Sequence, residues 1–371
     1  MQRTKVGVIG CGQISGIYLR NCTRAFDNLE VVACADLVPE LAERRAREFG
    51  IPKACSVVEL LGDPEIEVVL NLTVPHAHAG VNLQALQAGK HVYTEKPFAL
   101  SREDADAVLD LARSRNLRVG SAPDTFLGGG LQTCRKLIDD GAIGTPYGAS
   151  GLILMGNVYE RLHLGTERYL ELGWDPLFDM APYYLTALVF LLGPVRTVTG
   201  FTESVLREIT ITNPASPRHG ETVAVPAPMH GAAALHFQSG ALATVQAAKE
   251  SFGYTPRLEV YGTDGILYAP DPNAFGGPIR IHERNGAVRE LPCECRFTED
   301  SRGLGVADMA SGIRTGGAYR CSGDLASHVL DITLGIFESS RSGHHVEITA
   351  PEGLAAGLPA GHALLGVAGG A

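Results

Sequence analysis

Short apolar runs alternate with segments of helical periodicity along roughly the first 125 residues of the chain. Apolar runs of strand length occur at residues 6–9, 31–35, 67–72, 91–94 and 117–120. Amphipathic segments, with apolar side chains three and four positions apart, lie between them at residues 14–22, 39–49, 76–88 and 101–115. Strands that alternate with helices in this way predict a parallel, doubly wound α/β sheet.

The pattern changes at Phe126, after which most apolar runs are strand-like and helices are few. The expected strands lie at residues 147–155, 196–201, 230–237, 242–248, 257–261 and 279–282, and the expected helices at 131–140, 180–192, 306–314 and 324–341. This texture predicts an α+β domain with a mostly antiparallel sheet. Because 371 residues exceed what one core usually takes, we expect two domains, at 1–125 and 126–350, and a loosely ordered tail at 351–371.

The first predicted strand is followed at once by a glycine-rich turn, Gly10-Cys11-Gly12-Gln13-Ile14-Ser15. Gly10 permits a tight turn, Gly12 lets the backbone approach a pyrophosphate, and Ser15 is small enough for close helix-to-strand packing. About 20 residues further on, the second strand ends in Asp36, where a carboxylate accepts hydrogen bonds from a ribose diol. The sequence therefore predicts a dinucleotide site. Since Asp36 would repel a 2′-phosphate and no arginine directly follows it, we expect NAD in preference to NADP.

Polar residues follow the next predicted strands, at the rim where doubly wound sheets bind their ligands. His91–Pro97 is the most distinctive stretch: a short buried strand that ends in a carboxylate, an ammonium and a proline. Lys96 should lie where the two domains meet. His78 has two readings, a residue that lines the nicotinamide or a histidine on a helix surface. We expect the cofactor to contact Gly10, Gly12, Gln13, Ile14, Asp36, Thr73, Pro75, His78, Glu95 and Lys96.

The predicted helix at 180–192 places Asp179 and Tyr183 four positions apart, on one face. Asp179 is either part of the chemistry or a plain N-cap, and Tyr183 either reaches a substrate or is a core aromatic. Trp174, the only tryptophan, either stacks on a sugar face or packs beneath its loop. His163, with Asn157, Tyr159 and Arg161 in the same cluster, either binds hydroxyls or belongs to a solvated loop.

The composition of the chain limits the classes of partner, compartment and metal site that we expect. The formal net charge of −10 argues against nucleic acid or an anionic membrane as partner. No stretch reaches 18 consecutive apolar residues, and the first strand begins too early to leave room for a signal peptide. The scattered cysteines suit a reducing cytoplasm. We expect no metal, because Cys293-Glu294-Cys295 has no matching second pair.

Several motifs resemble the glucose–fructose oxidoreductase / inositol dehydrogenase (Gfo/Idh/MocA) family over nearly the whole chain. They are 8–15, 88–97, 122–128, 177–180, 260–263 and 302–303, of which Glu95-Lys96-Pro97 after a strand is the most specific. The resemblance implies an N-terminal Rossmann domain and a C-terminal domain with a large open sheet, which often forms the subunit interface of a dimer or tetramer. It also implies hydride transfer between NAD(P) and a sugar, polyol or sugar derivative. The lysine beside nicotinamide and substrate would be Lys96, and the proline after it is commonly cis.

The family's Asp-x-x-x-His motif carries an acid/base histidine, and here Asp179 is followed at that place by Tyr183. Oxidation of an alcohol removes a proton, which histidine, with a pKa near ~6.5, accepts more readily than tyrosine, near ~10. We hypothesise that the ammonium of Lys96 lowers the pKa of Tyr183, so that this pair moves the proton while Asp179 orients Lys96 or the hydroxyl. In a rival version Lys96 itself, or His163, moves it. The residues expected to meet the substrate are Lys96, His163, Trp174, Asp179 and Tyr183.

Three functions fit these features. The first is an NAD-dependent oxidoreductase acting on the secondary hydroxyl of a sugar-like substrate, as a homo-oligomer. The second is an NAD-recycling glycosidase or lyase that oxidises a sugar carbon transiently, eliminates and re-reduces. The third is a non-enzymatic dinucleotide sensor on the same scaffold.

Overall fold

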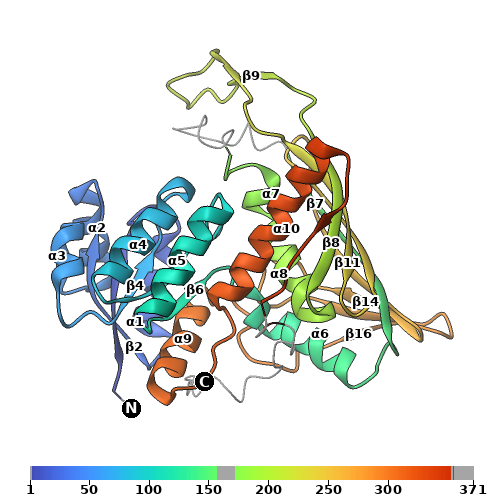
Figure 1. The fold of residues 1–371 in the computed structure, drawn as a ribbon, viewed down its shortest axis with the longest axis horizontal. Helices are drawn as coiled ribbons and strands as arrows, with labels where there is room; N and C mark the ends of the chain where they lie inside the picture. The colour runs from blue at the N-terminus through green and yellow to red at the C-terminus, as the bar shows by residue number, and fades with distance from the viewer. Residues whose placement is uncertain (1, 157–171, 352–353, 355–371) are drawn as a thin grey trace. The chain divides into compact units, whose positions relative to one another are not determined.

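The computed structural model describes residues 2–156, 172–351 and 354, in two compact units (Figure 1). Unit 1 comprises Met1–Gly128 and Cys295–Ser327, and unit 2 comprises Gly129–Glu294 and the segment that begins at His328. The expected tail at 351–371 falls almost entirely outside the described residues. In the part of the chain that the structure describes, no helix is long and apolar enough to cross a membrane.

Unit 1 is a doubly wound sheet with the strand order β3-β2-β1-β4-β5-β6, whose neighbouring strands pair in parallel. This order is that of a Rossmann fold, which confirms the predicted fold class. The elements are β1 (Thr4–Ile9), α1 (Ser15–Arg24), β2 (Leu29–Ala35), α2 (Pro39–Phe49), β3 (Lys53–Cys55), α3 (Val57–Gly62), β4 (Val68–Asn71), η1 (Pro75–Ala77), α4 (His78–Gln87), β5 (His91–Thr94), α5 (Arg102–Ser114), β6 (Val119–Ser121) and η2 (Thr125–Leu127).

The sequence pattern missed one strand and one helix of unit 1. The edge strand β3 is partly exposed and too short for an apolar run to reveal it. The six-residue helix α3 is capped by Ser56, whose side chain accepts from the backbone N–H of Glu59, while the Glu59 carboxylate accepts from that of Ser56. This reciprocal capping stabilises a helix that is too short to show periodicity.

The expected second domain at 126–350 is wrong for residues 295–327, which pack into unit 1 as α9 (Leu304–Thr315) and the start of α10 (Gly323–Ser342). The side-chain amide of Asn21 donates to the carbonyls of Asp300 and Arg302, at 2.9 and 2.8 Å. The buried carboxylate of Asp124 accepts from the backbone N–H groups of Gly303 and Gly305 at the start of α9. Because these hydrogen bonds come from residues far away in sequence, no local pattern within residues 295–327 indicates that the segment belongs to unit 1.

Unit 2 is built on a large sheet with the strand order β16-β15-β14-β13-β7-β12-β11-β8-β17. Only the β7–β12 pair is parallel within this described sheet, so the prediction of a mostly antiparallel sheet is confirmed. Its elements are α6 (Gly129–Asp139), β7 (Pro146–Met155), α7 (Pro176–Asp179), α8 (Ala181–Leu192), β8 (Val195–Glu203), β9 (Glu208–Thr210), β10 (Thr222–Ala224), β11 (His230–Phe237), β12 (Leu242–Ala248), β13 (Tyr254–Gly262), β14 (Gly265–Ala269), β15 (Ile279–Glu283), β16 (Val288–Leu291), the remainder of α10, and β17 (Val346–Glu347).

Helices cover one face of this sheet (Figure 1). Residues of β11 and β12 alternate between buried and exposed positions, as expected when one face packs on helices and the other does not. α10 is bonded to β8 through Ser339, whose hydroxyl accepts from the backbone N–H of Gly200 at 3.1 Å. All residues of α8 are buried, so this helix lies inside the unit and has no solvent face.

Candidate functional site

The turn after β1 requires glycine at its first position. Gly10 has a φ of +101°, and a Cβ there would lie 2.5 Å from the carbonyl carbon and oxygen of Leu72, which follows the neighbouring strand β4. A Cβ on Gly12 would meet nothing within 4 Å. The Ser15 hydroxyl at the start of α1 donates to the carbonyl of Gly12 at 2.7 Å. Packing therefore fixes Gly10, whereas Gly12 leaves an open approach to the backbone.

Asp36, at the end of β2, is held beside this turn. Its carboxylate accepts from the backbone N–H of Cys11 at 2.7 Å and from that of Val38 at 2.9 Å. These bonds fix the carboxylate at the carboxyl end of β2, the end of the strands at which open α/β sheets bind ligands.

Arg45 of α2 braces the same turn and was missed from the sequence. Its guanidinium donates to the carbonyl of Gly12 and to the hydroxyl of Ser15, both at 3.0 Å, and pairs with Glu48 at 2.6 Å. Sequence reasoning searched for an arginine only directly after Asp36. An arginine on the next helix reaches the turn because α2 lies close to α1.

The surface around the turn fits a dinucleotide. Gly12 and Gln13 are exposed, and three apolar side chains stand in solvent beside them: Ile14 is 37% exposed, Leu37 93% and Val38 49%. Exposed apolar side chains suit an adenine ring, the start of a helix suits a pyrophosphate, and a fixed carboxylate suits a ribose. The residues present therefore fit NAD.

Hydrogen bonds fix the rim beyond β4. Asn71, the last residue of β4, accepts from the Thr73 hydroxyl at 2.7 Å and donates to the carbonyl of His78 at 3.1 Å. His78 is fully buried, so the reading of a surface histidine is wrong. Its Nδ1 lies 2.7 Å from the carbonyl of Pro97, its Nε2 lies 3.1 Å from that of Thr73, and burial lowers its pKa. A neutral imidazole has one N–H, so the ring donates to one of these two carbonyls and lies beside the other, between Thr73 and the segment after β5. Pro75, the first residue of η1, is buried beside it.

Glu95 and Lys96 follow β5. Glu95 is buried, and its carboxylate accepts from the Tyr18 hydroxyl at 2.7 Å and from the Lys96 backbone N–H at 2.9 Å. Burial and the nearby Glu95 raise the pKa of Tyr18 well above its usual value. The Lys96–Pro97 peptide bond is cis, as the family resemblance implied, and the Lys96 side chain is half-buried. Glu95 therefore anchors the backbone from which Lys96 projects.

In unit 2, Asp175 and not Asp179 is the helix cap. The buried Asp175 carboxylate accepts from the backbone N–H groups of Leu177 and Phe178, at 3.0 and 3.2 Å, at the start of α7. Asp179 ends that helix, and α8 begins at Ala181 after a break at Met180. The single helix expected at 180–192 is therefore preceded by an extra turn. The reading of Asp179 as a plain N-cap is wrong.

The Asp179 carboxylate makes an ion pair with Lys249, which the sequence reasoning missed. Lys249 Nζ lies 3.1 Å from Asp179 Oδ2, and it also donates to the carbonyl of Trp174. The only signal in the sequence was a lysine placed directly after the apolar end of a predicted strand.

Tyr183 is buried near a second cluster of polar groups. The Tyr254 hydroxyl donates to Asp271 Oδ2 at 2.6 Å, and the Tyr184 hydroxyl lies 3.5 Å from Oδ1 of the same carboxylate. Burial, the bond to Asp271 and, to a smaller extent, Tyr183 raise the pKa of Tyr254. Tyr183 therefore belongs to a buried aromatic environment that also contains polar groups.

The predicted site residues are divided between the units. The cofactor set and Lys96 belong to unit 1, and Trp174, Asp179 and Tyr183 belong to unit 2. His163, with Asn157, Tyr159 and Arg161, lies outside the described residues. Within residues 2–156 and 172–351, the structure contains no group of three His, Cys, Asp or Glu side chains able to hold a metal ion.

Comparison with known proteins adds independent findings. Residues 4–122 match the family model for "Oxidoreductase family, NAD-binding Rossmann fold", and residues 131–268 match that for "GFO/IDH/MocA C-terminal domain". The chain is 29% identical to a 1,5-anhydro-D-fructose reductase from Ensifer adhaerens, over 92% of this chain and 98% of that protein. It is 27% identical to an inositol 2-dehydrogenase from Saccharopolyspora erythraea, over 93% and 95%.

Among solved structures, a levoglucosan dehydrogenase in complex with NADH and L-sorbose superposes with a TM-score of 0.82. The match covers 94% of this chain and 99% of that one at 21% identity, and so it bears on the fold.

Proposed function

Because the chain belongs to the GFO/IDH/MocA family of oxidoreductases, we propose that it transfers a hydride between NAD and a secondary hydroxyl of a sugar, polyol or sugar derivative. The observation that carries this proposal is the near full-length similarity to proteins named for reactions of that kind, a 1,5-anhydro-D-fructose reductase and an inositol dehydrogenase. The turn at Gly10–Ser15 and the oriented Asp36 support it, since these residues fit the cofactor that such a reaction requires.

NAD, when bound, supplies a nicotinamide that accepts or returns the hydride. We propose that Gly12, Gln13 and Ile14 contact its pyrophosphate and that Asp36 binds the adenosine ribose. NAD should be preferred over NADP, because the Asp36 carboxylate would face a 2′-phosphate. The Arg45 guanidinium already bonds to Gly12, Ser15 and Glu48, so we do not expect it to compensate for that repulsion.

We propose that Thr73, Pro75, Glu95 and Lys96 line the nicotinamide end. His78 supports this rim from beneath, through its contacts with the carbonyls of Thr73 and Pro97. The ring lies between the carbonyls that flank the proposed nicotinamide position and donates its one N–H to one of them.

The proton of the substrate hydroxyl must leave as the hydride does. We propose that Tyr183 accepts it and that the Lys96 ammonium stabilises the phenolate that forms. Asp179, whose carboxylate makes an ion pair with Lys249, is proposed to bind the substrate hydroxyl. Trp174 is proposed to contact the sugar. In the rival mechanism Lys96 moves the proton and Tyr183 only shapes the pocket.

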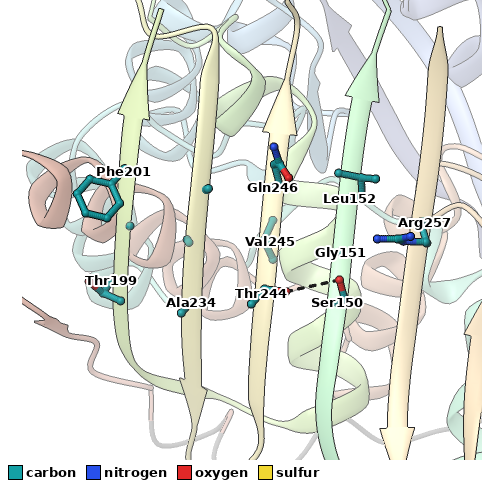
Figure 2. A pocket seen from close by; sticks show the side chains of 13 residues that line it. Ser150, Gly151, Leu152, Thr199, Phe201, Ala234, Thr244, Val245, Gln246 and Arg257 are labelled. Atoms are coloured by element: carbon teal, nitrogen blue, oxygen red, sulfur yellow. Dashed lines mark hydrogen bonds between the residues drawn. The ribbon is translucent and has the colours of Figure 1, made fainter. Parts of the chain in front are cut away.

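We propose that the open face of the unit 2 sheet joins two copies of the chain. Figure 2 shows its polar side chains on neighbouring strands, with Thr244 Oγ1 donating to Ser150 Oγ at 3.5 Å. Phe201 of β8 stands 75% exposed and Leu242 of β12 stands 60% exposed, on the two strands that flank β11. Exposed apolar side chains on a broad sheet face favour association with another surface. A Phe201→Asp/Leu242→Asp double variant should therefore be smaller than the wild type in sedimentation, whereas a Val58→Asp control in unit 1 should not.

All eight cysteines, which lie within the described residues, are free thiols. This supports a reducing compartment, and we propose the cytoplasm.

The test is a panel of sugars and polyols offered with NAD, followed by the absorbance of NADH. Lys96→Ala should still bind NADH but lose turnover. Accumulating NADH separates net oxidation from the recycling mechanism, in which the cofactor pool stays unchanged. A chain that binds NADH but turns over no member of the panel would instead favour the sensor.

A further inference from the structure

Lys249 is a buried cation next to a proposed active-site carboxylate. It directly follows β12, and its side chain is 1% exposed. The ammonium lies 3.1 Å from Asp179 Oδ2, at the end of α7, and it donates to the carbonyl of Trp174 in the loop before that helix. One side chain therefore joins the sheet to two residues proposed to meet the substrate.

A buried ammonium is costly unless it is paired and hydrogen-bonded. A second carboxylate, that of Asp175, is also near enough for Lys249 to oppose the rise in its pKa that burial causes. Asp175, however, is already bonded to three backbone N–H groups, those of Gly173, Leu177 and Phe178. The direct ion pair is with Asp179, whose side chain is 16% exposed and so reaches the surface.

We propose that Lys249 is a positioning residue that acts through Asp179. It keeps the carboxylate ionised and holds it at the end of α7, four residues before Tyr183 of α8. The proposal rests on the function proposed above, in which Asp179 binds the substrate hydroxyl. The Trp174 carbonyl shares the same ammonium, so Lys249 also sets the distance between that loop and the carboxylate.

The charge of Lys249 should be visible in the pH dependence of turnover. Lys249 after β12 is the cation paired with Asp179, Asp175 at the start of α7 is a second carboxylate near the same ammonium, and Tyr183 follows four positions later in α8. Without Lys249, Asp179 would take up a proton more readily, and the acidic limb of kcat/KM would move to higher pH.

The experiment compares Lys249→Met, Lys249→Arg and the surface control Lys136→Met in the full chain. Lys249→Met should lower kcat/KM about 100-fold and move the acidic limb up by about one pH unit. Lys249→Arg should keep the limb at its wild-type position, because the charge remains, and recover much of the rate. NADH affinity should be unchanged in all three, since the cofactor residues belong to unit 1. An acidic limb in Lys249→Met at the wild-type pH, or one in Lys249→Arg that moves as far as in Lys249→Met, would overturn the proposal.

Measurements of unfolding test the ion pair without relying on activity. They are needed if Lys249→Met folds poorly or if the wild type oxidises no substrate. Asp179→Asn combined with Lys249→Met should be more stable than Lys249→Met alone, because it removes the carboxylate left without its cation. If the two losses of stability simply add, the ion pair is absent and the inference about Lys249 fails. If the losses are coupled but no sugar is oxidised, the proposed function fails while the ion pair stands.

Discussion

Alanine substitutions at Gly10, Gly12 and Gly50, all in unit 1, distinguish three effects of an added methyl group: backbone strain, steric clash with neighbouring atoms, and obstruction of the bound cofactor. Gly10 combines a φ of +101° with a Cβ position 2.5 Å from the Leu72 carbonyl. Gly50, the C-cap of α2, has a φ of +68° but open space around it, and Gly12 has open space and no positive φ. Each substitution adds one methyl group, so differences among them arise from the site.

The expected magnitudes follow from these geometries. A positive φ costs alanine about 1–2 kcal/mol, and forcing a methyl group into packed backbone costs about 1–3 kcal/mol more. Gly10→Ala should therefore lower the free energy of unfolding by about 2–5 kcal/mol, and Gly50→Ala by about 1–2 kcal/mol. Gly12→Ala should change it by less than about 1 kcal/mol. It should nevertheless weaken NADH binding at least about 10-fold, because the methyl group occupies the pyrophosphate's approach to the backbone.

Urea denaturation gives the stabilities, and titration of NADH fluorescence gives the affinities. Gly50→Ala is the matched control, since it should lose stability without losing affinity. The reasoning would be refuted by a Gly10→Ala protein as stable as Gly50→Ala, or by a Gly12→Ala protein that binds NADH like the wild type.

Three further substitutions address the cofactor, the proton and the acid stability. Asp36→Asn should shift the ratio of NAD to NADP affinities toward NADP by about 10- to 100-fold, the equivalent of one hydrogen bond to a charged group; an unchanged ratio in a binding titration would contradict the ribose assignment. Tyr183→Phe should lower kcat by about 100-fold, and a kcat equal to the wild type at every pH would favour Lys96 as the proton acceptor. His328 accepts from the Val195 backbone N–H at 3.1 Å, and burial lowers its pKa to about 4. Because the unfolded chain then binds the proton more tightly, the free energy of unfolding should fall by up to about 3 kcal/mol as pH drops from about 6.5 to 4. His328→Gln should flatten that decline in urea titrations at several pH values, and a decline as steep as in the wild type would show that other groups cause it.

The sequence predicted those parts of the fold whose structure is determined by residues close together in sequence. β1, the glycine turn, α1, β2 and Asp36 lie in one continuous stretch, and their apolar periodicity and turn chemistry are both local. The cis bond before Pro97 came from the family resemblance, and no local pattern in the chain would have supplied it.

The parts that were missed depend on contacts between distant residues. Lys249 lies 75 positions from Trp174 in sequence and meets it because α7 packs against β11 and β12. Residues 295–327 join unit 1 through bonds such as that from Asn21 to Asp300, across 279 positions. The helix cap at Asp175 was misplaced because an apolar run cannot show where a helix breaks and restarts, as happens at Met180.

Transfer of deuterium tests the central claim most directly. The wild-type protein would be incubated with NAD and a panel of sugars and polyols that carry deuterium at their carbinol carbons. The mass of the NADH released would then be measured by mass spectrometry. Direct hydride transfer predicts NADH one mass unit heavier with at least one member of the panel, and none with Lys96→Ala. Unlabelled nicotinamide with every member, from a protein that binds NADH and is folded, would contradict the claim that this chain is a dehydrogenase.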